Sequence, residues 1–151
     1  KSKRTLQTAK LYYRNLKIIS DKRINEIDYG DAEGLKPKEY KLQYPRKFND
    51  WENNKDPRFP NGENYNDLNY RLINFLKNKI LDSNENICVF THNNIVRMIL
   101  FINFENLKFQ QMLCLQIKHL EMIKIKFNKS NLYLNINNQK KKKFYKSIFY
   151  K

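Results

Sequence analysis

Apolar residues recur at helical spacing in three parts of the chain. Residues 5–16 are predicted to form one helix, and residues 40–51 a second that is interrupted at Pro45. The clearest amphipathic pattern covers residues 65–82, where Asn64 stands in position to cap the helix. Its apolar face consists of Leu68, Leu72, Phe75, Leu76 and Ile80. We therefore expect a long helix near the middle of the chain.

The second half of the chain also contains patterns that are typical of β-strands. Residues 87–90 are short, fully apolar and rich in β-branched side chains, which predicts a buried parallel strand. A polar loop at residues 91–94 and a helix from residue 95 to 101 follow it. Alternating apolar residues after Leu115, with a turn at residues 128–131, predict a hairpin. Helix, buried strand, polar loop and helix in this order are typical of an α/β fold.

The first half contains less regular structure. Ile18 and Ile19 are predicted to form a short strand. Residues 24–35 and 53–64 contain the glycines and several of the prolines of the chain, and both read as loops.

Composition fits a single domain over residues 1–151, because 40% of the residues are hydrophobic and 14% are aromatic. Apolar runs are too short for a membrane span, which needs roughly 18 residues, and a signal peptide is missing from this sequence. We therefore expect a cytoplasmic protein that does not bind membranes.

The charge is strongly positive, since 30 Lys and Arg residues face 15 Asp and Glu residues for a formal net charge of +15. Such a charge attracts phosphorylated ligands and polyanions. However, the lysines are spread along the chain and no nucleic-acid-binding motif accompanies them. An AT-rich coding sequence would produce the same bias. We expect a phosphorylated small molecule as substrate rather than nucleic acid, and a basic C-terminal tail at residues 138–151.

His92 stands where ligands bind in open α/β sheets, beyond the C-terminal end of the predicted strand. The helix that follows offers free N–H groups and the positive end of its dipole, both of which suit a phosphate. A histidine there can hydrogen-bond an anion or carry a proton. Taken alone, His92 reads more readily as a structural residue. The second histidine, His119, is interpreted as structural or exposed.

Four segments in register change this interpretation, because together they resemble the histidine phosphatase (phosphoglycerate-mutase-like) superfamily in order and approximate spacing. These segments are Arg-Thr-Leu-Gln-Thr-Ala at residues 4–9, Asn-Glu-Ile-Asp-Tyr-Gly at 25–30 with Glu-Gly-Leu at 33–35, Phe-Pro-Asn-Gly-Glu-Asn at 59–64 with Arg71, and Thr-His-Asn at 91–93 with Arg97. The similarity covers residues 4–101 well and the hairpin more loosely.

The resemblance implies a three-layer α/β/α sandwich with a mostly parallel sheet, a phosphohistidine intermediate, and neither metal nor cofactor. By resemblance, Arg4 contacts the phosphoryl group, together with Asn93, and Glu26 is the general acid or base. His92 would stabilise the phosphoryl group during transfer. Glu63 either belongs to the site or braces its helix. Physical chemistry agrees, since phosphoryl transfer depends on positioning and cationic donors, and a half-buried Glu26 could protonate the leaving oxygen.

One part of the family pattern is missing, because the sequence has no Arg-His-Gly segment to supply the nucleophilic histidine. Arg4 also comes so early that a strand, a helix and a strand would precede Lys1. We therefore expect an N-terminally truncated domain with an incomplete sheet, inactive alone, whose unpaired edges leave room for self-association. A phosphomonoester phosphatase is the leading hypothesis. A phosphoglycerate mutase and a non-catalytic phosphate- or RNA-binding descendant are the alternatives, and the natural substrate is left open.

Overall fold

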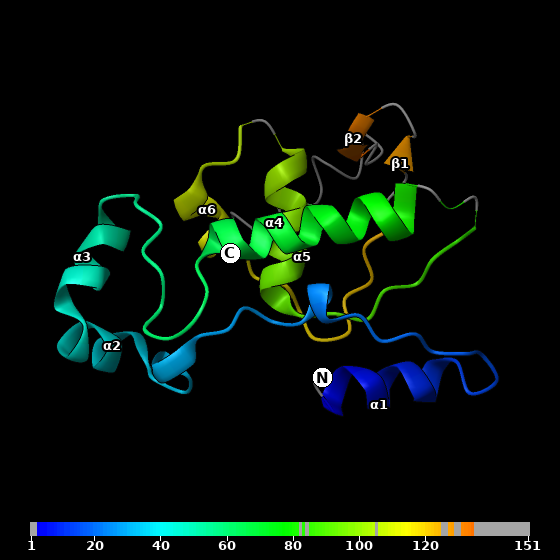
Figure 1. The fold of residues 1–151 in the computed structure, drawn as a ribbon, viewed down its shortest axis with the longest axis horizontal. Helices are drawn as coiled ribbons and strands as arrows, with labels where there is room; N and C mark the ends of the chain where they lie inside the picture. The colour runs from blue at the N-terminus through cyan, green and yellow to red at the C-terminus, as the bar shows by residue number, and fades with distance from the viewer. Residues whose placement is uncertain are drawn as a thin grey trace.

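The structure is a computed structural model that describes residues 3–81, 83, 85–104, 106–124, 127–128 and 131–134 (Figure 1). The α-helices described are α1 (Lys3–Tyr12), α2 (Pro37–Gln43), α3 (Pro45–Glu52), α4 (Tyr65–Phe75), α5 (Asn93–Asn103) and α6 (Phe109–Leu113). Two 3-10 turns, η1 (Lys22–Ile24) and η2 (Gly30–Ala32), and a π-helical stretch, η3 (Leu76–Leu81), complete the helical elements. In Figure 1, α4 crosses α5, and α1 lies to one side of this pair.

The α4 helix begins where the sequence predicts it. The Asn64 side chain accepts a hydrogen bond from the Asp67 amide at 2.9 Å, and the Asp67 carboxylate accepts one from the Asn64 amide at 3.0 Å. This reciprocal pair satisfies two backbone donors at the helix start. Leu68 and Leu72 have no exposed surface, so the predicted apolar face is the buried face. The helix continues as η3 to Leu81, which agrees with the predicted helix up to that residue.

The hydrophobic core lies mainly between α4 and α5. Ile95, Met98 and Leu100 of α5 are almost fully buried, as is Met112 of α6. Burial of such side chains stabilises a fold by about 1.5–3 kcal/mol each relative to exposure. By contrast, α1 buries only Ala9 among its described residues. The core therefore holds α4 and α5 firmly, while α1 is packed more lightly.

The predicted three-layer sandwich with a mostly parallel sheet is wrong for the described part of the chain. The strands assigned there, β1 (Phe127–Asn128) and β2 (Asn131–Leu134), form a two-stranded antiparallel sheet, which confirms the predicted hairpin. Residues 87–90, predicted as a buried strand, are assigned to no strand and pair with no described strand, and Ile87 is 44% exposed. A strand is stable only where a neighbour supplies ladder partners. Here the aromatic rings of Tyr12 and Tyr13, at the end of α1, pack against the ring of Phe90 in this segment.

Of the smaller predictions, the structure confirms some and does not confirm others. The interruption at Pro45 is confirmed, since that residue begins α3 directly after α2 ends. Ile18 and Ile19 are not assigned to a strand. The basic tail at residues 138–151 lies outside the described residues. In the part of the chain that is described, the helices are too short or too polar to cross a membrane.

Candidate functional site

Two loops meet backbone to backbone below α4, and both belong to the segments that carry the family resemblance. The Glu63 amide donates to the Asp28 carbonyl at 2.8 Å, and the Asp31 amide donates to the Pro60 carbonyl at 2.9 Å. Gly30 adopts a left-handed φ of +53°, and a Cβ atom there would stand 2.0 Å from the Pro60 carbonyl oxygen. Any residue other than glycine at position 30 would place its Cβ atom against this carbonyl. The close contact between the two loops therefore requires glycine at this position.

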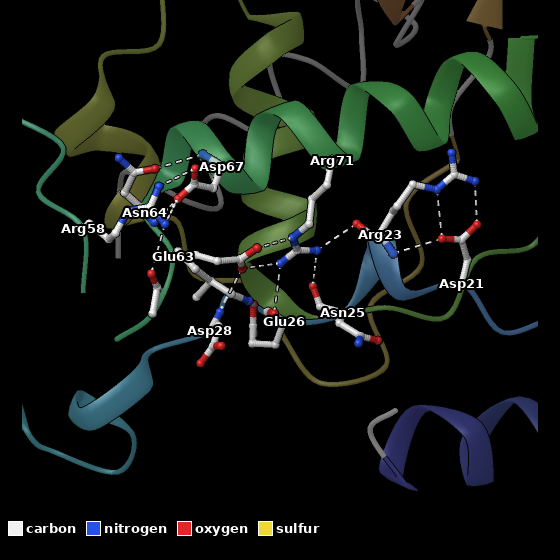
Figure 2. A network of polar contacts seen from close by, with 12 residues as sticks. Asp21, Arg23, Asn25, Glu26, Asp28, Arg58, Glu63, Asn64, Asp67 and Arg71 are labelled. Carbon is white, nitrogen blue, oxygen red and sulfur yellow. Dashed lines mark hydrogen bonds and ion pairs between the residues drawn. The ribbon is translucent and has the colours of Figure 1, made fainter. Parts of the chain in front are cut away.

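Arg71 of α4 reaches down to the loop that contains Glu26 (Figure 2). Its guanidinium forms a two-pronged ion pair with Glu63, with Nε to Oε1 and Nη2 to Oε2 both at 2.8 Å. Both side chains are mostly buried, with 16% of the Arg71 side chain and 24% of the Glu63 side chain exposed. Of the two interpretations given for Glu63, the structure favours the brace, because its carboxylate joins α4 to the loop.

The segment that contains His92 is attached to the same loop. Thr91 donates its hydroxyl to the Ile24 carbonyl at 2.8 Å, and the buried Asn94 donates its side-chain amide to the Tyr29 hydroxyl at 2.7 Å. His92 itself lies between these two attachments, in extended conformation at the N-cap of α5. The helix start that follows His92 has no side-chain cap. The first N–H groups of α5 therefore receive no hydrogen bond from the side chain at the N-cap.

Three of the predicted site residues share one electrostatic environment. Burial lowers the pKa of His92 below its ordinary value, the positive charges of Arg4 and Arg71 lower it further, and the Glu26 carboxylate raises it. Arg4 is exposed in the first turn of α1, and Glu26 and His92 are half-buried. The hydrogen bond from Thr91 to the Ile24 carbonyl joins the segment of His92 to the segment of Glu26, whereas Arg4 belongs to α1. Asn93 is exposed at the first residue of α5.

A cluster of polar side chains is centred on the buried Asn94, two residues after His92. The Asn94 side-chain oxygen accepts hydrogen bonds from the Tyr65 hydroxyl at 3.2 Å and from Arg97 at 3.3 Å. Burial raises the pKa of Tyr29 and of Tyr65, so both phenols stay neutral hydrogen-bonding groups. No sequence pattern assigned a role in the site to Tyr29, Tyr65 or Asn94. A signal existed, because Tyr65 begins a predicted helix and Asn94 directly precedes one, each next to a family segment.

This arrangement can bind an anion and move a proton. Arg4 supplies a permanent positive charge, His92 a titratable one, and Glu26 a carboxyl group within electrostatic reach of His92. Among the residues that the structure describes, His, Cys, Asp and Glu side chains form no group of three placed to hold a metal ion.

A family model described as the histidine phosphatase superfamily (branch 1) matches residues 1–139. A fructose-2,6-bisphosphatase of Saccharomyces cerevisiae is 34% identical over 98 residues, which cover 64% of this chain and 21% of that protein. A 2,3-bisphosphoglycerate-dependent phosphoglycerate mutase 2 of Gloeobacter violaceus is 31% identical over 87 residues, covering 55% of this chain and 40% of that protein.

A 6-phosphofructo-2-kinase/fructose-2,6-bisphosphatase 1 of Bos taurus is 35% identical over 99 residues, covering 65% of this chain and 20% of that protein. The chain therefore spans between about a fifth and two fifths of the length of the curated relatives it matches.

Proposed function

Because the chain belongs to the histidine phosphatase superfamily, we propose that it is part of a phosphomonoester phosphatase that works through a phosphohistidine intermediate. The observation that carries the proposal is the hydrogen bond from the Thr91 hydroxyl to the Ile24 carbonyl at 2.8 Å, which holds the segment of His92 against the segment of Glu26. A cation, a histidine and a carboxylate close together are the groups that phosphoryl transfer needs beside the nucleophile. We propose a phosphorylated small molecule as the substrate.

Each residue has a definite part in the proposed reaction. A histidine nucleophile attacks phosphorus, so that a P–N bond forms and the P–O bond to the leaving group breaks. Glu26 gives a proton to the departing oxygen, and Arg4, His92 and the exposed Asn93 bind the phosphoryl oxygens. Water then attacks the phosphohistidine and gives its proton to Glu26, and inorganic phosphate leaves. The cycle restores every group and requires no metal or cofactor.

The relatives favour a phosphatase over a mutase as the first candidate. Two of the three proteins named above are fructose-2,6-bisphosphatases, which supports a sugar phosphate as the substrate of this chain. A phosphoglycerate mutase is the second candidate because the third relative carries that name. In a form of the protein that carries an Arg-His-Gly nucleophile, the product separates the two. Free phosphate supports the phosphatase, and an isomerised phosphoglycerate supports the mutase.

The 151 residues contain only His92 and His119, neither of which stands in an Arg-His-Gly segment. We therefore expect this chain by itself to hydrolyse p-nitrophenyl phosphate at a negligible rate, since covalent catalysis needs the attacking group itself. Turnover similar to that of a full-length relative, abolished by His92→Ala, would contradict this expectation.

Phosphate binding tests the proposal without requiring turnover. Titration calorimetry with orthovanadate and with inorganic phosphate would compare the wild-type chain with Arg4→Ala and with Arg14→Ala, an exposed arginine just beyond α1. Both variants remove one positive charge. Loss of a charge-assisted contact should weaken binding about tenfold or more in Arg4→Ala and very little in Arg14→Ala. Equal losses, or binding that only follows salt concentration, would support a non-catalytic polyanion-binding protein instead.

A further inference from the structure

The guanidinium of Arg71 is fully used by the protein. Besides the two bonds to Glu63, its Nη1 group donates to the carbonyls of Arg23 and Asn25, both at 2.8 Å, and Nη2 donates to the carbonyl of Glu26 at 3.0 Å. A guanidinium has five N–H donors. Each of the five has an acceptor here. Figure 2 shows Arg71 together with Glu63 and the loop residues whose carbonyls it binds.

This saturation decides between two roles for Arg71. An arginine near a phosphate site can be a ligand, but a ligand needs N–H groups that are free to turn to the phosphate. Arg71 would have to give up bonds to half-buried partners before it could bind phosphate. Breaking such charge-assisted bonds leaves polar groups unpaired. The contacts therefore favour a role in holding the protein chain itself.

The chain that Arg71 holds is the backbone around Glu26. Arg71 binds carbonyls before and at Glu26, and Glu63 binds the segment after it, because its Oε2 atom accepts the Asp28 amide at 3.0 Å. The Glu26 carboxylate accepts a hydrogen bond from the amide of its own neighbour, Ile27, at 3.0 Å. The direction of this side chain is thus tied to the backbone that the ion pair clamps.

We propose that Arg71, held in place by Glu63, is a positioning residue that fixes the carboxyl group of Glu26 relative to His92. Lysine cannot replace arginine in this role, because an ammonium is a compact charge that cannot reach two carboxylate oxygens and three carbonyls at once. The positional claim stands on the contacts alone. Its consequence for proton transfer rests on the proposed function.

Arg71→Lys tests the proposal because lysine keeps the positive charge but cannot reach all five acceptors at once. Arg58→Lys is the matched control, since Arg58 makes a similar two-pronged bond to Asp67 and also contacts Gly62, yet none of its described contacts reaches residues 23–28. Hydrogen exchange of the amides at residues 24–30 should become about tenfold faster in Arg71→Lys, measured relative to global unfolding. It should stay unchanged in Arg58→Lys.

A second readout detects the position of Glu26 itself. NMR titration of the His92 imidazole reports the Glu26 charge, so Glu26→Gln should lower the pKa of His92 in the wild-type background. In the Arg71→Lys background the same substitution should have a clearly smaller effect, because the carboxylate is no longer held. A purely structural arginine would leave this difference between backgrounds at zero.

The outcomes separate the positional claim from the proposed function. An equal effect of Glu26→Gln in both backgrounds, with unchanged exchange at residues 24–30, would overturn the positioning role. If Arg71→Lys does not fold, Glu63→Gln provides the second variant, since it keeps one acceptor for Arg71 and weakens the clamp. Failure of the wild-type chain to bind inorganic phosphate would contradict the proposed function. The positioning role of Arg71 would still be decided by hydrogen exchange and by the His92 titration.

Discussion

The hydroxyl of Thr91 donates a hydrogen bond to the backbone carbonyl of Ile24 at 2.8 Å, across 67 positions of sequence. One residue of this pair precedes His92 by a single position, and the other precedes Glu26 by two. The bond therefore joins the two segments that supply the proposed proton donor and the proposed phosphate-binding histidine. The protein itself therefore holds the segments of Glu26 and His92 together, and no substrate is needed for this.

Thr91→Val should destabilise the fold by about 1 kcal/mol, because it keeps the shape of the side chain but leaves the half-buried Ile24 carbonyl without its donor. The measurement is the free energy of unfolding in urea. Thr8→Val is the control, since Thr8 donates to the Arg4 carbonyl at 3.0 Å within one exposed helical turn. The control should change stability by less than about 0.5 kcal/mol. Equal losses in the two variants would contradict the importance of the long-range bond.

Asp56 caps α4 from outside the helix, and Asp56→Ala should cost about 1–2 kcal/mol. Its two carboxylate oxygens accept the Tyr65 amide at 3.0 Å and the Asn66 amide at 2.8 Å, which satisfies backbone donors and complements the helix dipole. Thermal unfolding followed by circular dichroism would measure the loss. Asp50→Ala removes an exposed ion pair with Lys55 and should cost little. A loss as large in Asp50→Ala would mean that net charge, not the cap, controls stability.

Gly30→Ala and Gly34→Ala separate backbone strain from collision. Both glycines have a positive φ, +53° and +80°, and an alanine there costs about 1–2 kcal/mol. At Gly34 the added Cβ would meet nothing within 4 Å, whereas at Gly30 it would collide with the Pro60 carbonyl. We expect Gly34→Ala to lose only the strain and Gly30→Ala to lose more than about 3 kcal/mol in urea unfolding. Similar losses would show that the two loops can separate.

The pH dependence of stability should carry a contribution from His92. Its pKa in the fold is lowered, chiefly by burial, so the unfolded chain binds the proton more readily. The free energy of unfolding should therefore fall as the pH falls from the ordinary histidine pKa of 6.5 toward the lower pKa of His92 in the fold. His92→Gln should flatten this part of the urea-midpoint profile. An unchanged profile in His92→Gln would show that other groups cause the acid sensitivity.

Local signals in the sequence located most of the helices. The cap at Asn64 and the helix start at Pro45 depend on neighbours a few residues away, so both could be predicted from the chain alone. The four motif segments also led to Arg4, Glu26 and His92, whose roles stay predictions, and the fold joins the segments of Glu26 and His92 through the Thr91–Ile24 hydrogen bond. The five-residue α6 was not predicted, because a helix of that length has too few turns to show an apolar period.

Residues 87–90 show where a local pattern is insufficient. Their apolar, β-branched composition is typical of a buried strand, but a strand depends on a partner elsewhere in space. Among the described residues that partner is absent, and Ile87 and Val89 are exposed. The role of Arg71 was missed for a related reason. Its carbonyl partners lie 45 to 48 positions earlier in the chain, where no periodicity can indicate them.

The close contact between the two loops has a consequence for how this chain can vary in evolution. A Cβ atom at Gly30 would meet backbone atoms of Pro60, Asn61 and Gly62, and one at Gly62 would stand 2.4 Å from the carbonyl of Asp28. Side-chain collisions can be relieved by a smaller neighbour, but every residue type carries the same backbone. No second substitution can therefore rescue a side chain at either glycine. Natural variants of this segment should accordingly keep both glycines, and a search for compensating mutations of Gly30→Ala among side chains of the facing loop should find none.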